Sequence, residues 1–345
     1  MKIKTASTLL AWYDRQHRKL PWRAPPGQLA DPYRVWLSEI MLQQTVVKTV
    51  IPYYHYFLEQ WPEVADLATA DLDQVLHAWQ GLGYYARARN LHKCAQVVAA
   101  EYSGAFPDTE AGLLKLPGIG PYTAAAVAAI AFGRKASPVD GNIERVVSRL
   151  FAVQEPLPGV KPKLRQLAAT LTPDSRAGDH AQALMDLGAT VCLPRAPLCE
   201  RCPLTKNCEG RKKGLAADLP KRAKKVPRPT RYGVAFCLYD DQGRLLFRRR
   251  PEKGLLGGMM EVPSTPWRER QWPSGETAAH APLDTEWRSI PGTVVHVFTH
   301  FRLELEVQTG TGARTAGKGE VWQRVEDLGE LALPTVIKKV LRHAL

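Results

Sequence analysis

The stretch Leu116-Pro-Gly-Ile-Gly-Pro-Tyr-Thr-Ala124 determines how the first part of the chain is expected to fold. Its two glycines, Gly118 and Gly120, permit a tight turn and a close approach of the backbone to another molecule. The alanine-rich run that follows predicts a helix over residues 121–132. Because the first N–H groups of a helix lack partners within it, this turn is able to bind a phosphate oxygen. The glycines alone are equally typical of a plain loop between helices.

Apolar residues recur with helical spacing on both sides of this turn, up to about residue 210. Asp31-Pro32 is a helix start signal, with aspartate as N-cap and proline at the first helical position. No convincing strand appears in this part of the chain. An all-helical region is therefore predicted, with further helices over 33–51, 71–80, 85–102, 142–151 and 163–171.

A basic, proline-containing segment follows the helical region. Between Lys206 and Arg231 ten lysine and arginine residues oppose two acidic ones, a net charge of +8 (10 − 2). Its prolines favour an extended connector, which we assign to residues 211–230. Beyond it the apolar period changes to two, which is typical of strands. The second region is predicted to hold a hairpin over 234–239 and 244–248, a strand over 293–307 and a terminal helix over 334–345.

Length and charge limit the class of protein. The 345 residues suggest two or three domains, and no stretch approaches the roughly 18 apolar residues that a membrane-spanning helix needs. The net charge of +13 indicates a polyanionic partner, with solubility as the alternative explanation. The N-terminus lacks the pattern of a signal or transit peptide, so a cytoplasmic protein is expected. In that compartment the six cysteines should stay reduced.

Four of the six cysteines fall within 17 residues, separated by six, two and five residues. Four thiols this close in a reducing compartment indicate the ligands of one metal centre. Thiolate softness allows either zinc or an iron–sulfur cluster, and spacing alone does not separate the two. Unrelated free thiols are the alternative, although the other two cysteines are isolated in the sequence. The candidate ligands are Cys192, Cys199, Cys202 and Cys208.

Two carboxyl groups stand out as an acid–base pair. Three of the four helical neighbours of Glu39 are apolar, so its carboxyl group is expected to keep its proton toward neutral pH and to act as a general acid. Asp140 precedes a predicted helix and should stay ionised near that N-terminus. Such a pair of carboxyl groups is used to break glycosidic bonds. The alternatives are a salt-bridged core glutamate and a simple N-cap, a place that Asn142 could also take.

These motifs together resemble the MutY-type adenine DNA glycosylases of the endonuclease III superfamily. The cysteine spacing looks like the structural [4Fe–4S] loop of that superfamily, and residues 116–124 look like its helix-hairpin-helix. Strand-cleaving members carry a lysine two residues after the second glycine, where this chain has Tyr122. Further strings in the family's order are Leu-Pro-Trp-Arg at 20–23, Leu-Gln-Gln-Thr at 42–45, Gly-Leu-Gly-Tyr-Tyr at 81–85 and Val-Asp-Gly-Asn at 139–142.

The resemblance implies roles for single residues. Glu39 would protonate adenine, Asp140 would stabilise the sugar cation, and Tyr122 and Asn142 would organise the site. Without a lysine at position 122 no Schiff base forms there, which favours a base-releasing enzyme whose nucleophile is water or a carboxylate. The implied contact residues are Arg18, Arg23 and Gln182 around the adenine, Gln44 and Tyr84 as wedges while the base is flipped out, Thr45 and Leu82 near the opposite base, and Gly118 and Gly120 at a phosphate.

Residues 254–263 resemble the entry strand of Nudix-type domains. A catalytic Nudix box also needs a dense Arg-Glu-x-x-Glu-Glu helix, which residues 264–290 lack, so an active Nudix hydrolase is disfavoured. In MutY-type enzymes the degenerate domain recognises 8-oxoguanine, commonly through a Phe-Ser-His turn. This chain has Phe298, Thr299 and His300 there, which keeps the hydroxyl group and adds a methyl group. The alternative for Thr299 is an ordinary residue of an exposed strand.

The resemblance predicts a helical glycosylase region over 1–210, with a six-helix module at roughly 25–135 and an iron–sulfur module formed by the N-terminal helix and 136–210. An α+β Nudix-like domain would cover 231–345. The expected protein is a monomeric, monofunctional adenine DNA glycosylase of base excision repair with a [4Fe–4S] cluster. Its substrate would be double-stranded DNA with adenine opposite 8-oxoguanine or guanine. The alternatives are a superfamily glycosylase for thymine, uracil or oxidised pyrimidines, and a DNA-binding iron–sulfur protein without activity.

Overall fold

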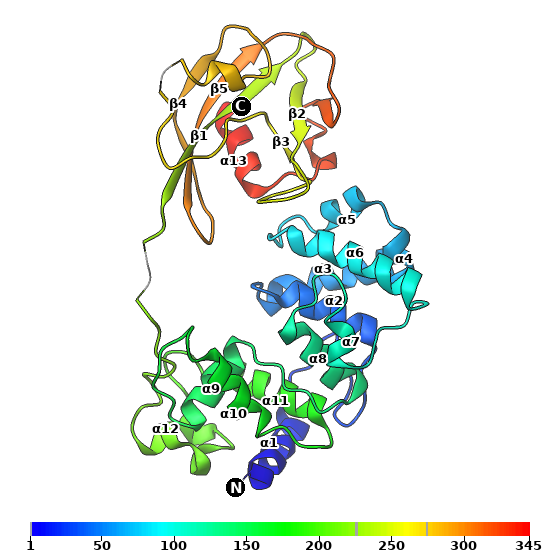
Figure 1. The fold of residues 1–345 in the computed structure, drawn as a ribbon, viewed down its shortest axis with the longest axis vertical. Coiled ribbons are helices and arrows are strands. Elements are labelled where there is room, and N and C mark those ends of the chain that lie inside the picture. The colour runs from blue at the N-terminus through cyan, green and yellow to red at the C-terminus, as the bar shows by residue number, and fades with distance from the viewer. Residues whose placement is uncertain (1, 225–226, 274) are drawn as a thin grey trace. The chain divides into compact units, whose positions relative to one another are not determined.

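The computed structural model describes residues 2–224, 227–273 and 275–345, with side chains from residue 5 onward, and Figure 1 shows its elements. Residues 225 and 226 of the predicted linker lie outside the described residues. Packing divides the chain into two compact units, residues 2–69 with 90–224 and residues 70–89 with 227–345. The domain limits given from the sequence stay a prediction.

The first unit is built from helices, and the first strand assigned among the described residues begins only at Thr230. The prediction of an all-helical region followed by a sheet-containing domain is confirmed. The helices that lie wholly or mostly in this unit are α1 (Lys2–Gln16), α2 (Pro32–Leu42), α3 (Val47–Gln60), α4 (Val64–Thr69), α6 (Ala86–Glu101), α7 (Glu110–Leu113), α8 (Pro121–Phe132), α9 (Gly141–Leu150), α10 (Lys161–Ala169), α11 (Ala177–Thr190) and α12 (Glu209–Lys212).

The predicted helix over 33–51 is wrong, because the structure has two helices there. Asp31 caps α2 as expected, and its carboxylate accepts a hydrogen bond from the Arg34 backbone N–H. The chain then leaves the helix at Gln44, whose φ of 59° lies in the left-handed region, and α3 begins at Val47. A left-handed residue interrupts the hydrogen-bond ladder of a right-handed helix, so apolar periodicity alone extended the prediction too far.

One core joins α1, α9, α10 and α11, and three of the clustered cysteines pack against it. The close approach of α11 to α9 depends on Gly188. A Cβ atom at that position would lie 2.6 Å from the Cβ atom of Asn142. The first turn of α9 is therefore held directly against α11, and this contact positions the residues that begin α9.

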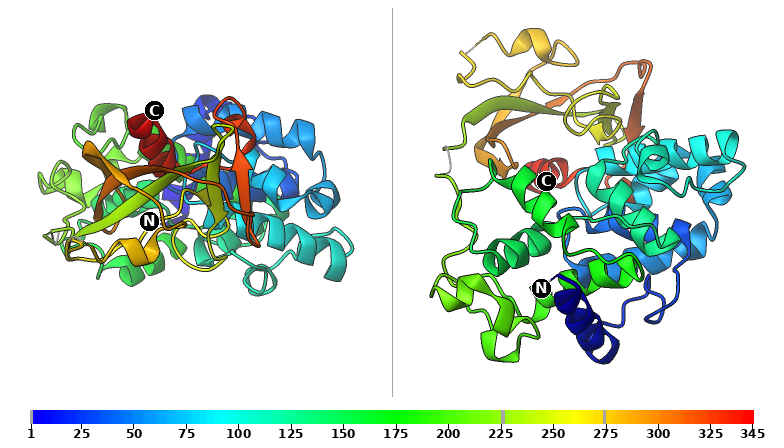
Figure 2. Two further views of the ribbon diagram at one scale, coloured as in Figure 1. Left: turned by 90° about the horizontal axis from the view of Figure 1, so that it is seen from above. Right: turned by 60° about the horizontal axis from the view of Figure 1, so that its bottom comes forward.

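The second unit holds a six-stranded sheet among its described residues (Figure 2). The strand order is β3-β2-β1-β5-β4, with β6 paired to β2; β1 and β5 are parallel and the other pairs are antiparallel. The predicted first hairpin is confirmed, with Tyr239 opposite Leu245. The elements are α5 (Leu72–Ala78), β1 (Thr230–Tyr239), β2 (Leu245–Arg249), β3 (Met260–Glu261), β4 (Arg288–Val297), β5 (Arg302–Thr311), β6 (Glu320–Gln323) and α13 (Thr335–Ala344).

The single strand predicted over 293–307 is wrong. The structure has two antiparallel strands there, β4 and β5, joined by a turn at residues 298–301. The Phe298 N–H donates to the Phe301 carbonyl oxygen across this turn at 2.9 Å. Apolar residues occupy odd positions on both sides of the turn, at 295, 297, 301, 303, 305 and 307, which hides the break in the sequence pattern. Phe298 and Phe301, three residues apart, both pack on one core.

The basic segment is not extended over its whole length. Residues 209–212 form α12, and Leu219 is buried in the first unit. The Leu157 N–H donates to the Lys221 carbonyl oxygen, and the Ala223 N–H donates to the Leu157 carbonyl oxygen, both at 2.9 Å. These contacts hold the segment against the first unit up to residue 223. The buried Leu219 side chain and the two backbone hydrogen bonds outweigh the preference of the prolines for an extended chain.

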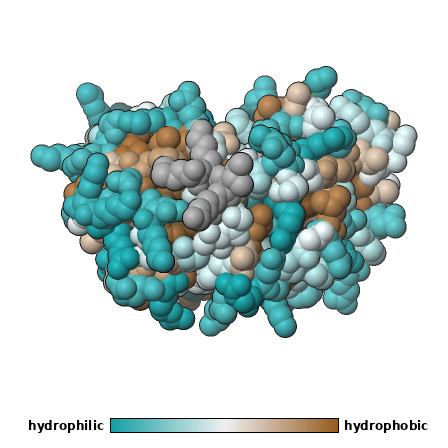
Figure 3. Space-filling view, turned by 90° about the horizontal axis from the view of Figure 1, so that it is seen from below, coloured by the Kyte–Doolittle hydropathy of each residue, from teal (hydrophilic) through white to brown (hydrophobic). Residues whose placement is uncertain are grey.

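Charged and polar side chains dominate the face drawn in Figure 3, with smaller apolar areas between them. Among the described residues, no helix combines the length and apolar character needed to cross a bilayer.

Candidate active site

Glu39 lies in the wall of a small cavity in the first unit. The α2 helix places this residue inward, where it is 5% exposed. Burial raises the pKa of the Glu39 carboxyl group to about 7. This direction agrees with the expectation that Glu39 keeps its proton toward neutral pH, and its role as a general acid stays a prediction. The cavity is lined by Trp22, Arg23, Val35, Ser38, Glu39, Ile130, Gln182 and Met185.

Tyr122 reaches Glu39 from the first turn of α8. Its hydroxyl group donates a hydrogen bond to Glu39 Oε2 at 2.8 Å. A bond that stabilises the ionised carboxylate lowers the Glu39 pKa, which offsets part of the effect of burial. Burial and the adjacent carboxylates raise the pKa of the Tyr122 hydroxyl group well above its ordinary value. Tyr122 therefore acts as a hydrogen-bond donor and not as a charged group.

Asp140 is the N-cap of α9, and this position orients its carboxylate. Asp140 Oδ1 accepts the Ile143 N–H at 2.7 Å, and Oδ2 accepts the Asn142 side-chain amide at 2.9 Å. Burial raises the Asp140 pKa, whereas these donors lower it. The donors at the helix start thus favour the ionised carboxylate, as expected, but the effect of burial on the pKa is larger. The proximity of Asp140 also raises the pKa of Glu39. The two carboxyl groups thus influence each other across one site.

Asn142 is held in turn by Arg145. An Arg145 terminal nitrogen donates to Asn142 Oδ1 at 2.8 Å and to the Gly188 carbonyl oxygen at 2.7 Å, and its Nε donates to the Cys192 carbonyl oxygen at 2.7 Å. One guanidinium group therefore contacts the start of α9, the end of α11 and the first clustered cysteine.

Arg23 and Arg18 meet at a buried carboxylate, Asp186. Both terminal nitrogens of Arg23 donate to Asp186, at 2.6 and 2.8 Å. Arg18 donates through Nε at 2.5 Å and through its backbone N–H at 2.9 Å. Of the predicted adenine contacts, Arg23 and Gln182 line the Glu39 cavity, whereas Arg18 is not among its described lining residues.

The glycine turn before α8 has the backbone that its sequence predicts. Gly118 has a φ of 73°, and a Cβ atom there would lie 2.5 Å from the Cβ atom of Asn90. Gly120 is the N-cap of α8, with Pro121 in the first turn. A cavity of about 510 Å³ opens beside this turn and reaches Tyr122. It is lined by Gln43, Glu110, Gly118, Gly120, Pro121, Tyr122, Thr123, Ala125, Ser137, Val139 and Arg165.

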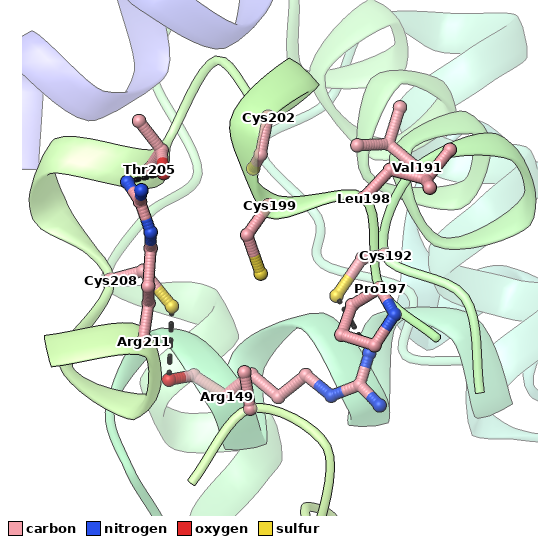
Figure 4. A pocket seen from close by; sticks show the side chains of 11 residues that line it. Arg149, Val191, Cys192, Pro197, Leu198, Cys199, Cys202, Thr205, Cys208 and Arg211 are labelled. Atoms are coloured by element: carbon pink, nitrogen blue, oxygen red, sulfur yellow. Dashed lines mark hydrogen bonds between the residues drawn. The ribbon is translucent and has the colours of Figure 1, made fainter. Parts of the chain in front are cut away.

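The four clustered cysteines line one cavity, and none is in a disulfide (Figure 4). Arg149 lies beside them and donates to Cys192 Sγ at 3.2 Å. Burial raises the pKa of the Cys202 thiol to about 12 and also raises that of Cys208. Thiolates here would need a strong cationic partner, which a metal centre supplies. Within the described residues, no group of three Cys, His, Asp or Glu side chains is arranged to hold a single metal ion.

Comparisons with known proteins place this geometry in a family. Residues 37–169 match the HhH-GPD superfamily of base excision DNA repair proteins, and residues 234–343 match the NUDIX domain. The adenine DNA glycosylase of Homo sapiens is 35% identical over 97% of this chain and 73% of the human protein.

The chain belongs to the adenine DNA glycosylase family.

Two further relatives bear on the limits of the likeness. The adenine DNA glycosylase of Mycolicibacterium smegmatis is 45% identical over 61% of this chain and 70% of that protein. The solved structure of a thermostable thymine-DNA glycosylase has a TM-score of 0.55 and 33% identity, and it covers 61% of this chain and 97% of its own. The likeness to the human adenine DNA glycosylase covers 97% of this chain and so extends through the second unit, whereas the likeness to the thymine-DNA glycosylase covers 61%.

Two loops with left-handed backbone carry four of the six predicted DNA-contact residues, and the other two, Gly118 and Gly120, lie in the turn before α8. Gln44 is exposed with a φ of 59°, and the half-buried Thr45 donates to the Gln43 carbonyl oxygen at 3.4 Å. In the second unit Tyr84 has a φ of 50° and is 46% exposed, whereas Leu82 is buried. Left-handed backbone at non-glycine residues is costly and occurs often at functional sites.

The predicted recognition turn joins β4 to β5 in the second unit. Phe298 is half-buried and stacks on Trp267 with 5.8 Å between ring centroids. Thr299 and His300 are exposed. The Thr299 Oγ1 atom lies 2.6 Å from the Tyr84 hydroxyl oxygen, so two residues predicted to contact DNA share a hydrogen bond.

Sequence reasoning missed the charged residues that support the site. Asp186, Arg145 and Arg149 each hold other parts of the first unit through the bonds described above or through backbone carbonyl groups. One signal was available for Asp186, which stands between Met185 and Leu187 in an otherwise small and apolar helical run. Nothing in the local pattern identifies its partners, which lie more than 160 residues away.

Proposed function

We propose that the chain is a monofunctional adenine DNA glycosylase, which hydrolyses the N-glycosidic bond of adenine mispaired with 8-oxoguanine or guanine. The observation that carries the proposal is Glu39, a buried carboxyl group with a pKa of about 7 in a cavity wall, bonded to Tyr122 and close to Asp140. A group with that pKa is able to give up a proton near neutral pH, which general-acid catalysis requires.

Glu39 would transfer its proton to a ring nitrogen of the flipped-out adenine. The electron pair of the breaking bond from sugar to base then remains on a neutral leaving group, which lowers the barrier. Tyr122 orients the Glu39 carboxyl group and stabilises the carboxylate that remains. Arg23 and Gln182 offer polar groups in the same cavity wall to a purine.

Asp140 would stabilise the positive charge that develops on the sugar. Its carboxylate is fixed by the Ile143 N–H and by the Asn142 amide, so it needs no reorganisation when the charge appears. Water, or transient capture by Asp140 followed by water, would complete the hydrolysis. Pairing of a proton donor with a fixed carboxylate is the arrangement that glycosidic bond cleavage uses.

Strand cleavage through a Schiff base is not expected. This chemistry needs an amine nucleophile, and the hairpin position where strand-cleaving relatives carry lysine holds Tyr122. A phenol with a strongly raised pKa is also a poor nucleophile. The proposal is therefore base release alone.

The cysteine cavity fits a [4Fe–4S] cluster held by Cys192, Cys199, Cys202 and Cys208. Four free thiols line one cavity, and this set of soft sulfur donors suits a multi-iron cluster. Bound there, the cluster would supply a structural crosslink. Arg149 would offset thiolate charge through its bond to Cys192.

The second unit would read the base opposite adenine. In its recognition turn Thr299 and His300 are exposed, and the neighbouring Phe298 is held by stacking on Trp267. Residues 264–273 and 275–287 contain no α-helix that would hold the acidic residues of a Nudix box, which argues against pyrophosphate hydrolysis. Gln44 and Tyr84 would fill the space that the flipped adenine leaves, and the net charge of +13 would provide salt-sensitive attraction to double-stranded DNA.

A single-turnover assay tests this function on duplexes that carry adenine opposite 8-oxoguanine, guanine or thymine. We expect rapid adenine release from the first, slower release from the second and none from the third. Failure to release adenine from the first duplex would refute the proposal. A thymine opposite guanine belongs in the same assay, because the likeness to a thymine-DNA glycosylase makes thymine release the rival outcome.

A further inference from the structure

Asp186 is a fully buried carboxylate that accepts hydrogen bonds from two arginines. It lies on α11 with 0% exposure, and four donors reach it from Arg18 and Arg23. The Arg23 pair is bidentate, with two parallel bonds that fix the plane of its guanidinium group. Asp186 is not itself among the described lining residues of the Glu39 cavity, whereas Arg23 is.

In this arrangement each terminal nitrogen of Arg23 donates one N–H to Asp186. Its side chain is 6% exposed, so water does not screen its charge effectively. An unpaired arginine at this depth would place a nearly unscreened positive charge in the cavity wall beside Glu39. The bidentate carboxylate offsets that charge and holds the group in one orientation.

We propose that Asp186 is a positioning residue for catalysis, which fixes Arg23 in the cavity wall and offsets its charge so that Glu39 keeps its proton for transfer to the purine. Asp186 does not touch the base in this scheme. It acts through Arg23, whose charge would otherwise favour the ionised form of Glu39. This inference rests on the proposed function for its catalytic meaning.

The groups that face Glu39 show in which direction the loss of Asp186 would act. Tyr122 from α8 and Arg23 from the segment before α2 favour the carboxylate, whereas Asp140 ahead of α9 favours the protonated form. Gln182, from α11, is uncharged. Arg23 is the only formal cation among the described groups that act on Glu39. Removal of its counterion therefore strengthens the electrostatic effect of Arg23, which favours the ionised form of Glu39.

A structural role is the rival explanation, because Asp186 also fastens the segment between α1 and α2. Asp179 offers a matched control on the same helix. It is buried as well, accepts the Gly27 N–H of that segment at 2.8 Å, and pairs with Arg176 at 2.7 Å. Its arginine extends to Asp14 and does not line the Glu39 cavity.

The experiment compares Asp186→Asn with Asp179→Asn in the full-length, iron-loaded protein. Single-turnover release of adenine opposite 8-oxoguanine is measured from about pH 5.5 to about pH 8.5. We expect Asp186→Asn to move the midpoint of the alkaline fall in rate to lower pH. The loss would be about tenfold at pH 8 and under about twofold at pH 5.5, as a change of one unit in the Glu39 pKa requires. Asp179→Asn should keep the wild-type midpoint.

The double variant Arg23→Gln/Asp186→Asn removes both charges and serves if Asp186→Asn does not fold. Its midpoint should lie at or above the wild-type value, because the cation that acts on Glu39 is gone. A midpoint below wild type in the double variant would overturn the proposal. An unchanged or raised midpoint in folded Asp186→Asn would also overturn it, and so would an equal shift in Asp179→Asn.

A carbon NMR titration of the Glu39 carboxyl group in the DNA-free protein separates this inference from the proposed function. A lower Glu39 midpoint in Asp186→Asn supports the positioning role even if the wild-type protein releases no adenine. An unchanged NMR midpoint overturns that role even if the wild-type protein is a fully active adenine glycosylase.

Discussion

Tyr122→Phe tests the acid role of Glu39 through a single atom. The substitution removes the hydroxyl group that donates to Glu39 Oε2 at 2.8 Å and keeps the ring. A hydrogen bond to a charged group contributes about 1.5 kcal/mol or more, and one pKa unit corresponds to about 1.4 kcal/mol. Because this bond favours the ionised carboxylate, its loss should raise the Glu39 pKa from about 7 by about one unit.

The assay is the ratio of single-turnover rates at pH 6 and pH 8. With a pKa of about 7, the protonated fraction of Glu39 falls from about nine-tenths to about one-tenth between these pH values, a ratio near ten. With a pKa raised by one unit the ratio should be about two. The ratio is used because Tyr122 also orients the carboxyl group, so absolute rates should fall at every pH.

Tyr33→Phe is the matched control for this variant. Tyr33 lies on the same helix as Glu39, is buried, and donates its hydroxyl group to the Trp61 carbonyl oxygen at 2.9 Å. Its loss should leave the ratio near ten. A ratio in Tyr122→Phe that equals or exceeds that of wild type would refute the assignment of the alkaline limb to Glu39.

Three further variants test other parts of the molecule. Glu39→Gln should abolish adenine release but keep mismatch binding. It should also be more stable than wild type at pH 8 by up to about 3 kcal/mol, because the raised Glu39 pKa makes wild-type stability fall as pH rises from 4.5 to about 7. The free energies of unfolding of Glu39→Gln and wild type are compared by urea unfolding. A difference between them that is equal at pH 5 and pH 8 would contradict this prediction. Arg149→Met should lower the free energy of unfolding by about 3 kcal/mol or more, because it leaves three backbone carbonyl groups without their donor. Urea unfolding measures this change. A loss under about 1 kcal/mol would be inconsistent with these bonds. Thr299→Ser keeps the hydroxyl group that contacts Tyr84 and removes a methyl group, so preference for 8-oxoguanine over guanine should rise. An unchanged rate ratio between the two duplexes would show that the methyl group has no effect.

The fold class could be predicted because its signals are local. The helix over 121–132 and the first hairpin follow from a glycine turn and from a change of apolar period, and the structure has both. The errors arose where one backbone angle or one turn interrupts a continuous pattern. Gln44 takes a left-handed conformation that glutamine as a residue type does not predict. The turn at 298–301 keeps apolar residues on one face of the sheet.

The residues of the candidate site also differ in whether the local sequence could identify them. Glu39 could be chosen from its own helical neighbours, and its burial and raised pKa agree with that choice. Asp186 could not be chosen, because its importance lies in partners that only the folded chain brings near. The basic segment was interpreted from its prolines, whereas a buried leucine and two backbone bonds determine its path.

The separation of Arg23 and Asp186 has a consequence for synthesis of the protein. The two residues are 163 positions apart in the chain. A ribosome that adds about 5 to 20 residues each second makes Asp186 about 8 to 30 seconds after Arg23. During that interval the nascent chain carries both arginines without their carboxylate, and α11 has not yet emerged to close the cavity wall. The site for the base is therefore among the last parts of the first unit to assemble, whichever helices form earlier.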